Sequence, residues 1–140
     1  MKLRLLGITA IVVIMLGVAG AMASRRMTGT IFGLGSPDHA PVGARVRVQV
    51  LNATTSRGLA QRATDHLRDK GFDVVEIGTN REKMDSTLVL DRSNHPDWAR
   101  RAAAAMGGAQ VLSRPDSSRY LDVTVLIGAS WRPPAQPFHP

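Results

Sequence analysis

The sequence predicts a two-layer α/β fold, in which a mixed sheet of about five strands carries two helices on one face. A hydrophobic helix is predicted to precede it. A strand–helix–strand pattern occurs twice along the chain, and the first and last strands alternate apolar and polar residues. Such alternation is typical of a sheet with one buried and one partly exposed face, so both helices are expected on the same side.

The first strand–helix–strand unit opens the fold. Valines at alternate positions predict a strand over residues 46–51. The apolar spacing then changes to that of a helix, predicted over 57–70, and a further strand is predicted over 72–78. Gly71 stands where helices commonly end in a left-handed residue. We expect the two strands to be parallel, with a right-handed crossover between them.

The second unit begins with a strand over 86–91 and continues with a helix over 96–106. Pro96 and Asp97 suit the first turn of this helix, and Asp97 and Arg101 have the spacing of an i,i+4 ion pair. Its apolar face consists of Trp98, Ala99, Ala102, Ala103 and Met106. A short strand over 109–113 and a closing strand over 121–127 are predicted to complete the sheet.

Residues 1–26 are predicted to direct export. Leu5 to Ala23 contains no charged residue, and its 19 residues stand at the boundary between a membrane-spanning helix and a long signal peptide. We expect an uncleaved single-pass anchor in the cell membrane, inserted through residues 5–23. The alternative is a signal peptide cleaved near Ala23, giving a secreted or periplasmic protein. Both interpretations place residues 24–140 outside the cytoplasm.

Composition marks out the remaining segments. Residues 27–44 contain four Gly and two Pro and predict a linker, and residues 132–140 form a Pro-rich tail. The folded domain is therefore expected over 45–131. The chain has no cysteine, which excludes disulfides, thiolate nucleophiles and Cys-based metal sites.

The net charge of +7 does not predict nucleic-acid binding. Within residues 45–131 there are 13 basic and 10 acidic residues, and the two signs are interspersed. One Tyr, three Phe and two Trp are too few for an evident base-stacking platform. Attraction to anionic lipid headgroups or acidic wall polymers is a better use of Arg25 and Arg26, and the alternative is that these two residues only flank the hydrophobic segment.

Several motifs occur in a characteristic order along the chain. They are Val50-Leu51-Asn52, Gly58-Leu59-Ala60, Gly71-Phe72-Asp73-Val74-Val75, Thr87-Leu88-Val89-Leu90 and the closing Asp122-Val123-Thr124-Val125-Leu126-Ile127-Gly128. This ordered set resembles the C-terminal domain of the LytR/CpsA/Psr cell-envelope family, over residues 45–131. One departure is Ala53, where the family usually has Gly. A left-handed backbone is less favourable at Ala53, so Asn52 is expected to adopt that conformation instead.

The resemblance implies a cell-envelope location. It does not imply the family's glycopolymer transfer, because nothing in this sequence corresponds to the catalytic domain that usually precedes the C-terminal one. We therefore expect a non-enzymatic domain without a cofactor, which binds an envelope protein or an acidic wall glycopolymer. The alternative function is that of an accessory or regulatory subunit of a separately encoded envelope glycopolymer phosphotransferase.

The best candidate site is the turn between the first strand and the first helix. A helix N-terminus at the carboxyl end of a parallel strand favours anions. We expect anion or partner binding by Asn52, Thr54, Thr55, Ser56 and Arg57. The structural alternative is that Thr55 or Ser56 only caps the helix. No GxGxxG or Walker sequence supports a nucleotide cofactor.

Other polar residues have simpler explanations. The histidines are scattered at positions 39, 66, 95 and 139, and no pair has the spacing of metal ligands on one element. Asp91, Arg92 and Asp97 lie close to His95 in sequence, but a charged loop followed by a helix cap explains them. Trp98 is expected to pack in the core rather than bind sugar.

Overall fold

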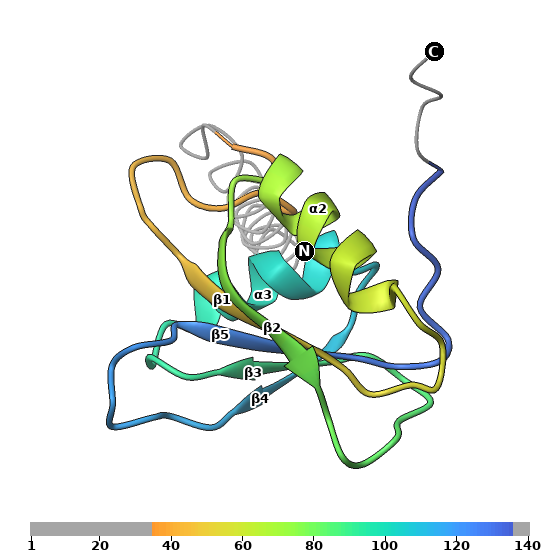
Figure 1. Cartoon of the computed structure of the whole chain (residues 1–140). Coiled ribbons are helices and arrows are strands. Elements are labelled where there is room, and N and C mark those ends of the chain that lie inside the picture. Colours follow the sequence, from red (N-terminus) through yellow and green to blue (C-terminus); the bar gives the residue numbers. More distant parts are fainter. Residues whose placement is uncertain (1–34, 136–140) are drawn as a thin grey trace, which may run out of the picture. The chain divides into compact units, whose positions relative to one another are not determined.

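The sheet of the domain has five strands in the order β2-β1-β5-β3-β4. The protein is described by a computed structural model that covers residues 35–135 (Figure 1). In chain order the elements are β1 (Arg47–Asn52), α2 (Leu59–Asp69), β2 (Asp73–Thr79), β3 (Leu88–Asp91), α3 (Pro96–Ala105), β4 (Gln110–Ser113) and β5 (Val123–Ile127). Every element predicted between residues 45 and 131 is present. The hydrophobic segment 5–23 lies outside the described residues.

The sheet is mixed, as predicted. Strand β1 is parallel to both β2 and β5, β3 is antiparallel to β5, and β4 is parallel to β3. The expected parallel pairing of the first two strands is confirmed, with Arg47 opposite Asp73 and Val50 opposite Ile77. A register shift after Val48 leaves one residue of β2 without a counterpart in β1.

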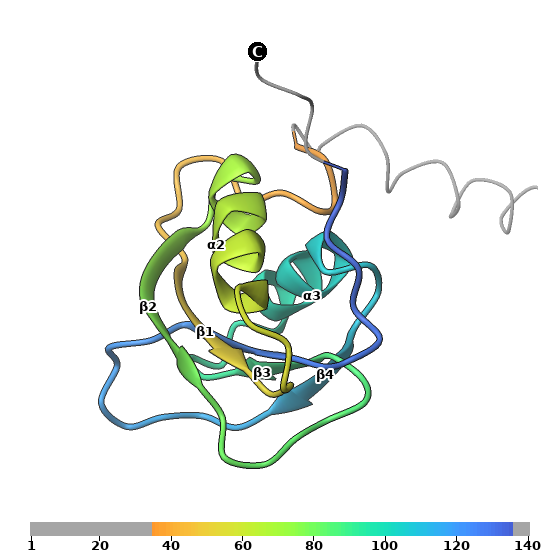
Figure 2. The ribbon, with the colours of Figure 1, turned by 45° about the vertical axis from the view of Figure 1, so that its right-hand side comes forward.

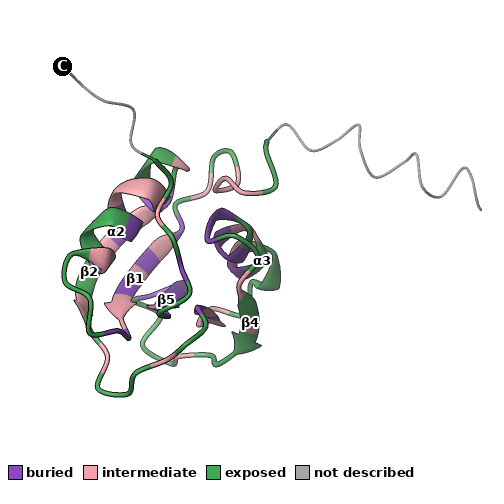
Figure 3. Cartoon of the chain, turned by 90° about the vertical axis from the view of Figure 1, so that its right-hand side faces the viewer, coloured by how far each residue is buried: buried purple, intermediate pink, exposed green. Residues whose placement is uncertain are grey.

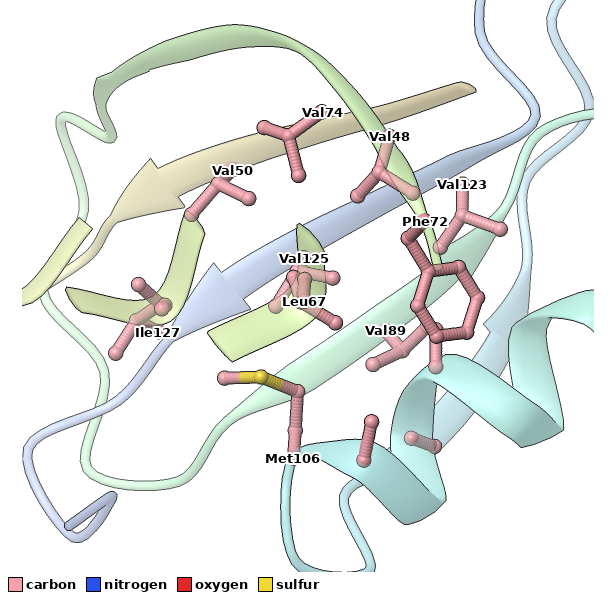
Figure 4. Close-up of a cluster of buried hydrophobic side chains, with 14 of the residues drawn as sticks. Val48, Val50, Leu67, Phe72, Val74, Val89, Met106, Val123, Val125 and Ile127 are labelled. Atoms are coloured by element: carbon pink, nitrogen blue, oxygen red, sulfur yellow. The ribbon is translucent and has the colours of Figure 1, made fainter. Parts of the chain in front are cut away.

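Both helices pack on the same face of the sheet, which confirms the two-layer prediction (Figures 1 and 2). Helix α2 covers β1 and β2, and α3 covers β3 and β4. Between the two layers lies a core of alternating strand valines, with Leu67 from α2, Met106 after α3 and the Phe72 ring (Figure 4). Strands β1, β2, β3 and β5 and both helices contribute buried residues to this core, whereas β4 has none (Figure 3). Burying each valine contributes about 1.5–3 kcal/mol.

Glycines in the left-handed conformation end the helices, as the sequence predicts. Gly71 follows α2 with φ 85°, and Gly107 and Gly108 follow α3 with φ 86° and 90°. At the start of α3, His95 is the N-cap and Pro96 occupies the first turn. These residues set the helix lengths, because Pro is tolerated only in the first turn and a left-handed residue stops propagation.

The ion pair expected between Asp97 and Arg101 does not form. Asp97 pairs instead with Arg100, one residue closer along the helix. Arg101 donates from Nη1 to the carbonyl oxygens of Ser36 at 3.1 Å and His39 at 3.3 Å. Arg101 does not pair with Asp97 because its guanidinium is bound to these two backbone carbonyls, which fixes the chain before β1 against α3.

The described end of the predicted linker, residues 35–44, has no helix or strand but contacts the domain. Asp38 accepts hydrogen bonds from Lys70 Nζ and Ser36 Oγ, each at 2.6 Å. The Lys70 ammonium, together with hydroxyl and imidazole donors from Ser36 and His39, holds the pKa of Asp38 well below its usual range. Ala40 adds a backbone bond to the Lys70 carbonyl at 2.9 Å. This segment therefore packs against the C-terminal end of α2.

The close of β5 lies directly against the segment that precedes β3. A Cβ on Gly128 would be 2.2 Å from the carbonyl carbon of Ser86. The Gly128 N–H donates to Thr87 Oγ1 at 3.1 Å, and the next two N–H groups donate to the carbonyls of Met84 and Asp85. The glycine that ends the closing sequence motif is therefore required by a backbone-to-backbone approach.

Candidate functional site

The turn predicted as a binding site, Asn52 to Arg57, is closed by its own hydrogen bonds. Asn52 Oδ1 accepts from the Thr54 N–H at 2.9 Å and from Thr54 Oγ1 at 2.8 Å. Asn52 Nδ2 donates to the Ser56 carbonyl at 2.8 Å, and the Ser56 N–H donates to Thr54 Oγ1 at 3.1 Å. Asn52 thus organises the loop as an Asx turn and satisfies two of its polar backbone groups.

The helix cap expected at Thr55 or Ser56 is wrong. The N-cap is Gly58, with φ 79° and no side-chain hydrogen bond to the helix, and α2 begins at Leu59. The chain turns into the helix through the left-handed glycine, so the helix starts two residues later than predicted. A residue without a Cβ is needed there because φ is positive.

The left-handed conformation expected at Asn52 is also absent. Among the described residues other than glycine, only Asn94 and Arg119 have positive φ. Ala53 is buried, its N–H donates to the Ile127 carbonyl at 3.0 Å, and its carbonyl accepts from the Met84 N–H at 2.8 Å. The chain therefore stays extended past the end of β1, and alanine fits where the family usually has glycine.

The five predicted site residues divide into two groups. Asn52 and Thr54 are partly or fully buried and hold the turn together, whereas Thr55, Ser56 and Arg57 are exposed. Ligand binding by this turn stays a prediction, now limited to the three exposed side chains.

A different group of polar residues meets at the opposite end of β1, around a pocket of about 380 Å³. Because β3 is antiparallel to β5, its carboxyl end lies beside the amino ends of β1 and β5. Three separate segments converge there: the start of β1, the β3–α3 loop, and the β4–β5 loop leading into β5. The lining residues are Arg47, Arg92, Ser93, Asn94, His95, Asp116, Arg119 and Asp122. We call this group the basic pocket.

The wall of the basic pocket is built by Arg47 and Asp122. Asp122 Oδ2 accepts from the Arg47 N–H at 2.9 Å and from Arg47 Nε at 3.0 Å, and Oδ1 accepts from Nη2 at 3.3 Å. Burial raises the pKa of Asp122, but the hydrogen bonds and charge of Arg47 outweigh it, and the net pKa lies below its usual range. The Asp122 carboxylate likewise raises the pKa of the Arg47 guanidinium. Both groups are charged at neutral pH.

A second acidic residue, Asp116, binds mainly to its own loop. Its carboxylate accepts from the Ser118 N–H at 3.1 Å and from Ser118 Oγ at 2.7 Å. These two bonds lower the pKa of Asp116, with a smaller contribution from Arg92. Arg92 approaches Asp116 only loosely, with 3.6 Å between Nη2 and Oδ2. The Arg92 Nε is buried and has no hydrogen-bond partner within residues 35–135.

Backbone strain is concentrated at the same place. Asn94 has φ 58° and Arg119 has φ 54°, and both line the basic pocket. A left-handed non-glycine residue is uncommon, and such strain tends to occur at functional sites. Buried Asp91 supports the β3–α3 loop by accepting from the Ser93 and His95 N–H groups, each at 3.1 Å. The His95 ring stacks on Trp98, with 4.0 Å between ring centroids.

Sequence reasoning identified parts of this site but not the pocket itself. The sequence predicts a charged loop at Arg92 and a helix cap at His95, and His95 is the N-cap of α3. Trp98 packs against the core, as expected. Arg119 lies 72 residues from Arg47, whose Nη2 donates to the Arg119 carbonyl at 2.8 Å. Only the strand order brings such distant residues together, so no local motif could have revealed the pocket.

The protein is a small α/β domain in which two helices cover one face of a five-stranded sheet. Arginines cluster at the end of the sheet where β1 and β5 begin. The family described as "LytR cell envelope-related transcriptional attenuator", LytR_C, matches residues 45–131. The chain belongs to this family, which confirms the resemblance predicted from the sequence motifs. The match identifies the LytR_C domain alone, with no catalytic domain.

One solved structure is similar to this chain. It is the crystal structure of the soluble domain (residues 71–217) of a conserved hypothetical secreted protein, an Rv2700 ortholog, from Mycobacterium marinum. The TM-score is 0.51 and the sequence identity is 19%, over 74% of this chain and 78% of that chain. This likeness supports the fold. A search of curated proteins found no match.

Within residues 35–135 no group of three His, Cys, Asp or Glu side chains is arranged to hold a metal ion. None of the helices in the same range is both long and apolar enough to cross a membrane. The membrane segment predicted over residues 5–23 and the cleavage position near Ala23 lie outside this range.

Proposed function

We propose that this protein is an exported, non-enzymatic cell-envelope domain that binds an acidic wall glycopolymer. The observation that carries the proposal is the basic pocket, where Arg47, Arg92 and Arg119 converge on one sheet edge. Arginine is suited to this use because its planar guanidinium donates paired hydrogen bonds to phosphate or carboxylate. The domain would remain tethered to the membrane through residues 5–23.

The family and the charge distribution support an envelope partner. LytR_C carries a description related to the cell envelope, and the similar crystal structure is of a domain from a secreted protein. The chain has a net charge of +7, which favours association with polyanions. Acidic wall polymers are polyanions that an exported domain meets at high local concentration.

The experiment is binding of the purified full chain, in mild detergent, to cell-wall sacculi. Co-sedimentation is expected at low salt and is expected to weaken as salt is raised, because ion pairing with a polyanion is screened. Wall material from which the acidic polymers have been stripped serves as the control. Equal sedimentation with both preparations would contradict the proposal.

A second candidate function, docking to a separately encoded envelope glycopolymer phosphotransferase, is favoured by the uncovered face of the sheet. Register pairing places five leucines on this face, across four adjacent strands, and no described helix covers them. They are Leu51, Leu88, Leu90, Leu112 and Leu126. Leu112 is exposed and the other four leucines are half-buried, and an apolar patch of this kind is typical of protein–protein contacts.

Two substitutions distinguish the candidates. Leu112→Asp on the edge strand β4 is expected to abolish co-purification of a protein partner from native envelope, while leaving sacculus binding unchanged. Arg119→Gln is expected to have the opposite pattern. Mass spectrometry of the captured proteins and glycans measures the effect of each substitution. If Leu112→Asp changes neither the co-purification of a protein partner nor sacculus binding, the leucine face is not a docking surface and the accessory-subunit function is wrong.

A further inference from the structure

The charges of the basic pocket are not balanced inside the pocket. Asp122 is fully occupied by Arg47, through three hydrogen bonds. Asp116 is held by Ser118 and lies 3.6 Å from Arg92, beyond normal hydrogen-bond length. Within residues 35–135 no hydrogen bond or ion pair is made by the Arg119 guanidinium. The pocket therefore has one loosely paired and one unpaired arginine facing a shared space.

The Arg92 side chain carries a further unmet requirement. Its Nε is buried without a partner in the described part of the chain, although buried polar groups are normally hydrogen-bonded. Arg92 is only about a quarter exposed, with 27% of its side chain accessible, so it is held in place rather than free in solvent. Nη2, which makes the loose 3.6 Å contact with Asp116 Oδ2, is the Arg92 atom left for a ligand in the pocket.

We propose that the basic pocket binds the phosphate group of a phosphorylated sugar, with Arg92 and Arg119 as the contacting cations. This assignment rests on the proposed function, because it names the chemical group of the wall polymer that the domain recognises. The shared chemistry is a phosphate next to sugar hydroxyls, whether in a free sugar phosphate or in a phosphate-linked polymer. Asn94 also lines the pocket, whereas the Ser93 hydroxyl is engaged with His95 Nδ1 at 3.0 Å and the Asp122 carbonyl at 3.4 Å.

Phosphate fits this arrangement better than carboxylate. A tetrahedral phosphate accepts hydrogen bonds in several directions, whereas a carboxylate accepts in one plane. Here the two arginines come from different loops, Arg92 after β3 and Arg119 before β5, and both line the pocket. The volume of about 380 Å³ lies within the range of about 300–1,000 Å³ that is typical of small-molecule sites.

Asp116 is the internal competitor of the ligand. Its Oδ2 lies 3.6 Å from Arg92 Nη2, a distance that makes a poor ion pair, and a bound phosphate would compete for the same nitrogen. Phosphate binding would replace this contact, while Ser118 keeps Asp116 in its loop. Removing the negative charge of Asp116 should therefore strengthen ligand binding, which a purely structural ion pair would not do.

The experiment measures binding of glucose 1-phosphate, glucuronate and glucose to the full chain in detergent by titration calorimetry. Glucose 1-phosphate is expected to bind, glucuronate to bind at least tenfold more weakly, and glucose to show no binding. Equal binding of glucuronate and glucose 1-phosphate would overturn the assignment to phosphate. Sacculi compared before and after hydrofluoric acid treatment, which cleaves phosphodiesters, separate a polymer from a free sugar phosphate.

The variants give the second readout. Arg119→Gln is expected to weaken glucose 1-phosphate binding about tenfold or more, since charged hydrogen bonds are lost. Arg81→Gln, which removes an exposed arginine in the β2–β3 loop, is the matched control and should change nothing. Asp116→Asn keeps an acceptor for Ser118 and is expected to raise the affinity several-fold. A loss of affinity in Asp116→Asn, with unchanged thermal stability, would contradict the competitor role.

Failure of this inference and failure of the proposed function have different signatures. If sacculi bind the wild-type chain and Arg119→Gln equally well, and glucose 1-phosphate does not bind, the basic pocket is not the site but the domain still binds wall. If glucose 1-phosphate binds and sacculi do not, the pocket assignment stands and the wall-binding function is wrong.

Discussion

The contact between Gly128 and Ser86 makes Gly128→Ala the most informative stability variant. An added Cβ would stand 2.2 Å from the Ser86 carbonyl carbon and 2.5 Å from its oxygen. Ordinary contact between carbon atoms is about 3.5–4.0 Å, so the two backbone segments would have to separate by more than about 1 Å. The nearest atoms belong to the backbone of Ser86, which cannot rotate away as a side chain does.

The loss of stability expected for Gly128→Ala depends on the hydrogen bonds that cross this contact. The N–H groups of residues 128–130 donate to Thr87 Oγ1 and to the Met84 and Asp85 carbonyls, at 3.1, 2.9 and 2.8 Å. Each such bond contributes about 0.5–1.5 kcal/mol, and overpacking adds about 1–3 kcal/mol. Some relaxation is expected, so Gly128→Ala should lower the free energy of unfolding by about 2–4 kcal/mol. For a domain of this size, that corresponds to a fall in Tm of roughly 8–30 °C.

Thermal unfolding of the full chain in mild detergent, followed by circular dichroism, measures this change. Two other glycines provide matched controls. A Cβ on Gly35 would meet its nearest neighbours at 3.9 and 4.0 Å, so Gly35→Ala should change stability by about 0.5 kcal/mol or less. A Cβ on Gly78 would lie 3.1 Å from the flexible end of Leu51, so an intermediate loss is expected. Equal Tm values for the Gly128 and Gly35 variants would refute the argument from backbone approach.

Three further predictions concern the turn after β1 and the wall of the basic pocket. Asn52→Ala should cost about 1–3 kcal/mol because it leaves backbone and hydroxyl groups of the turn unpaired, whereas Thr55→Ala should cost about 0.5 kcal/mol or less; comparable urea midpoints would contradict this difference. Ala53→Gly should destabilise by about 0.5–1 kcal/mol, because φ is not positive there and glycine adds only unfolded-state entropy; a more stable variant would show that the position is strained. The lowered pKa of Asp122 stabilises the fold above the unfolded-state value of about 3.9, and this contribution is lost as the pH falls through the folded value. Acid titrations of unfolding should therefore be less steep below about pH 4 in Asp122→Asn, and equal slopes would argue against the pair with Arg47.

The elements of the fold could be predicted because each depends on residues close together in sequence. Alternating valines define β1, and glycines at 71 and 107 mark where the helices stop. The errors also have local causes. The start of α2 was placed too early because Gly58, not Thr55 or Ser56, turns the chain into the helix. Polar residues before a helix therefore indicate a cap only when no left-handed glycine follows them.

The basic pocket could not be predicted because it depends on strand order. Sequence alone indicated a sheet of mixed strands, but several orders satisfy that pattern. In the observed order, the reversed direction of β3 brings its final loop to the amino ends of β1 and β5. Arg47 and Asp122, separated by 75 residues, then form the pair that builds the pocket wall.

The residues that maintain the fold are separate in space from the residues that line the basic pocket. The sequence motifs that identify the family lie along β1, β2, β3 and β5 and at the start of α2, and two of their residues maintain the fold: Asn52 closes a turn and Gly128 permits a backbone contact. The polar groups that remain available for a partner lie in the β3–α3 and β4–β5 loops, outside those motifs except for Asp122. Because Arg119 is exposed and lies outside the hydrophobic core, we expect its substitution to change the pocket while leaving the fold intact.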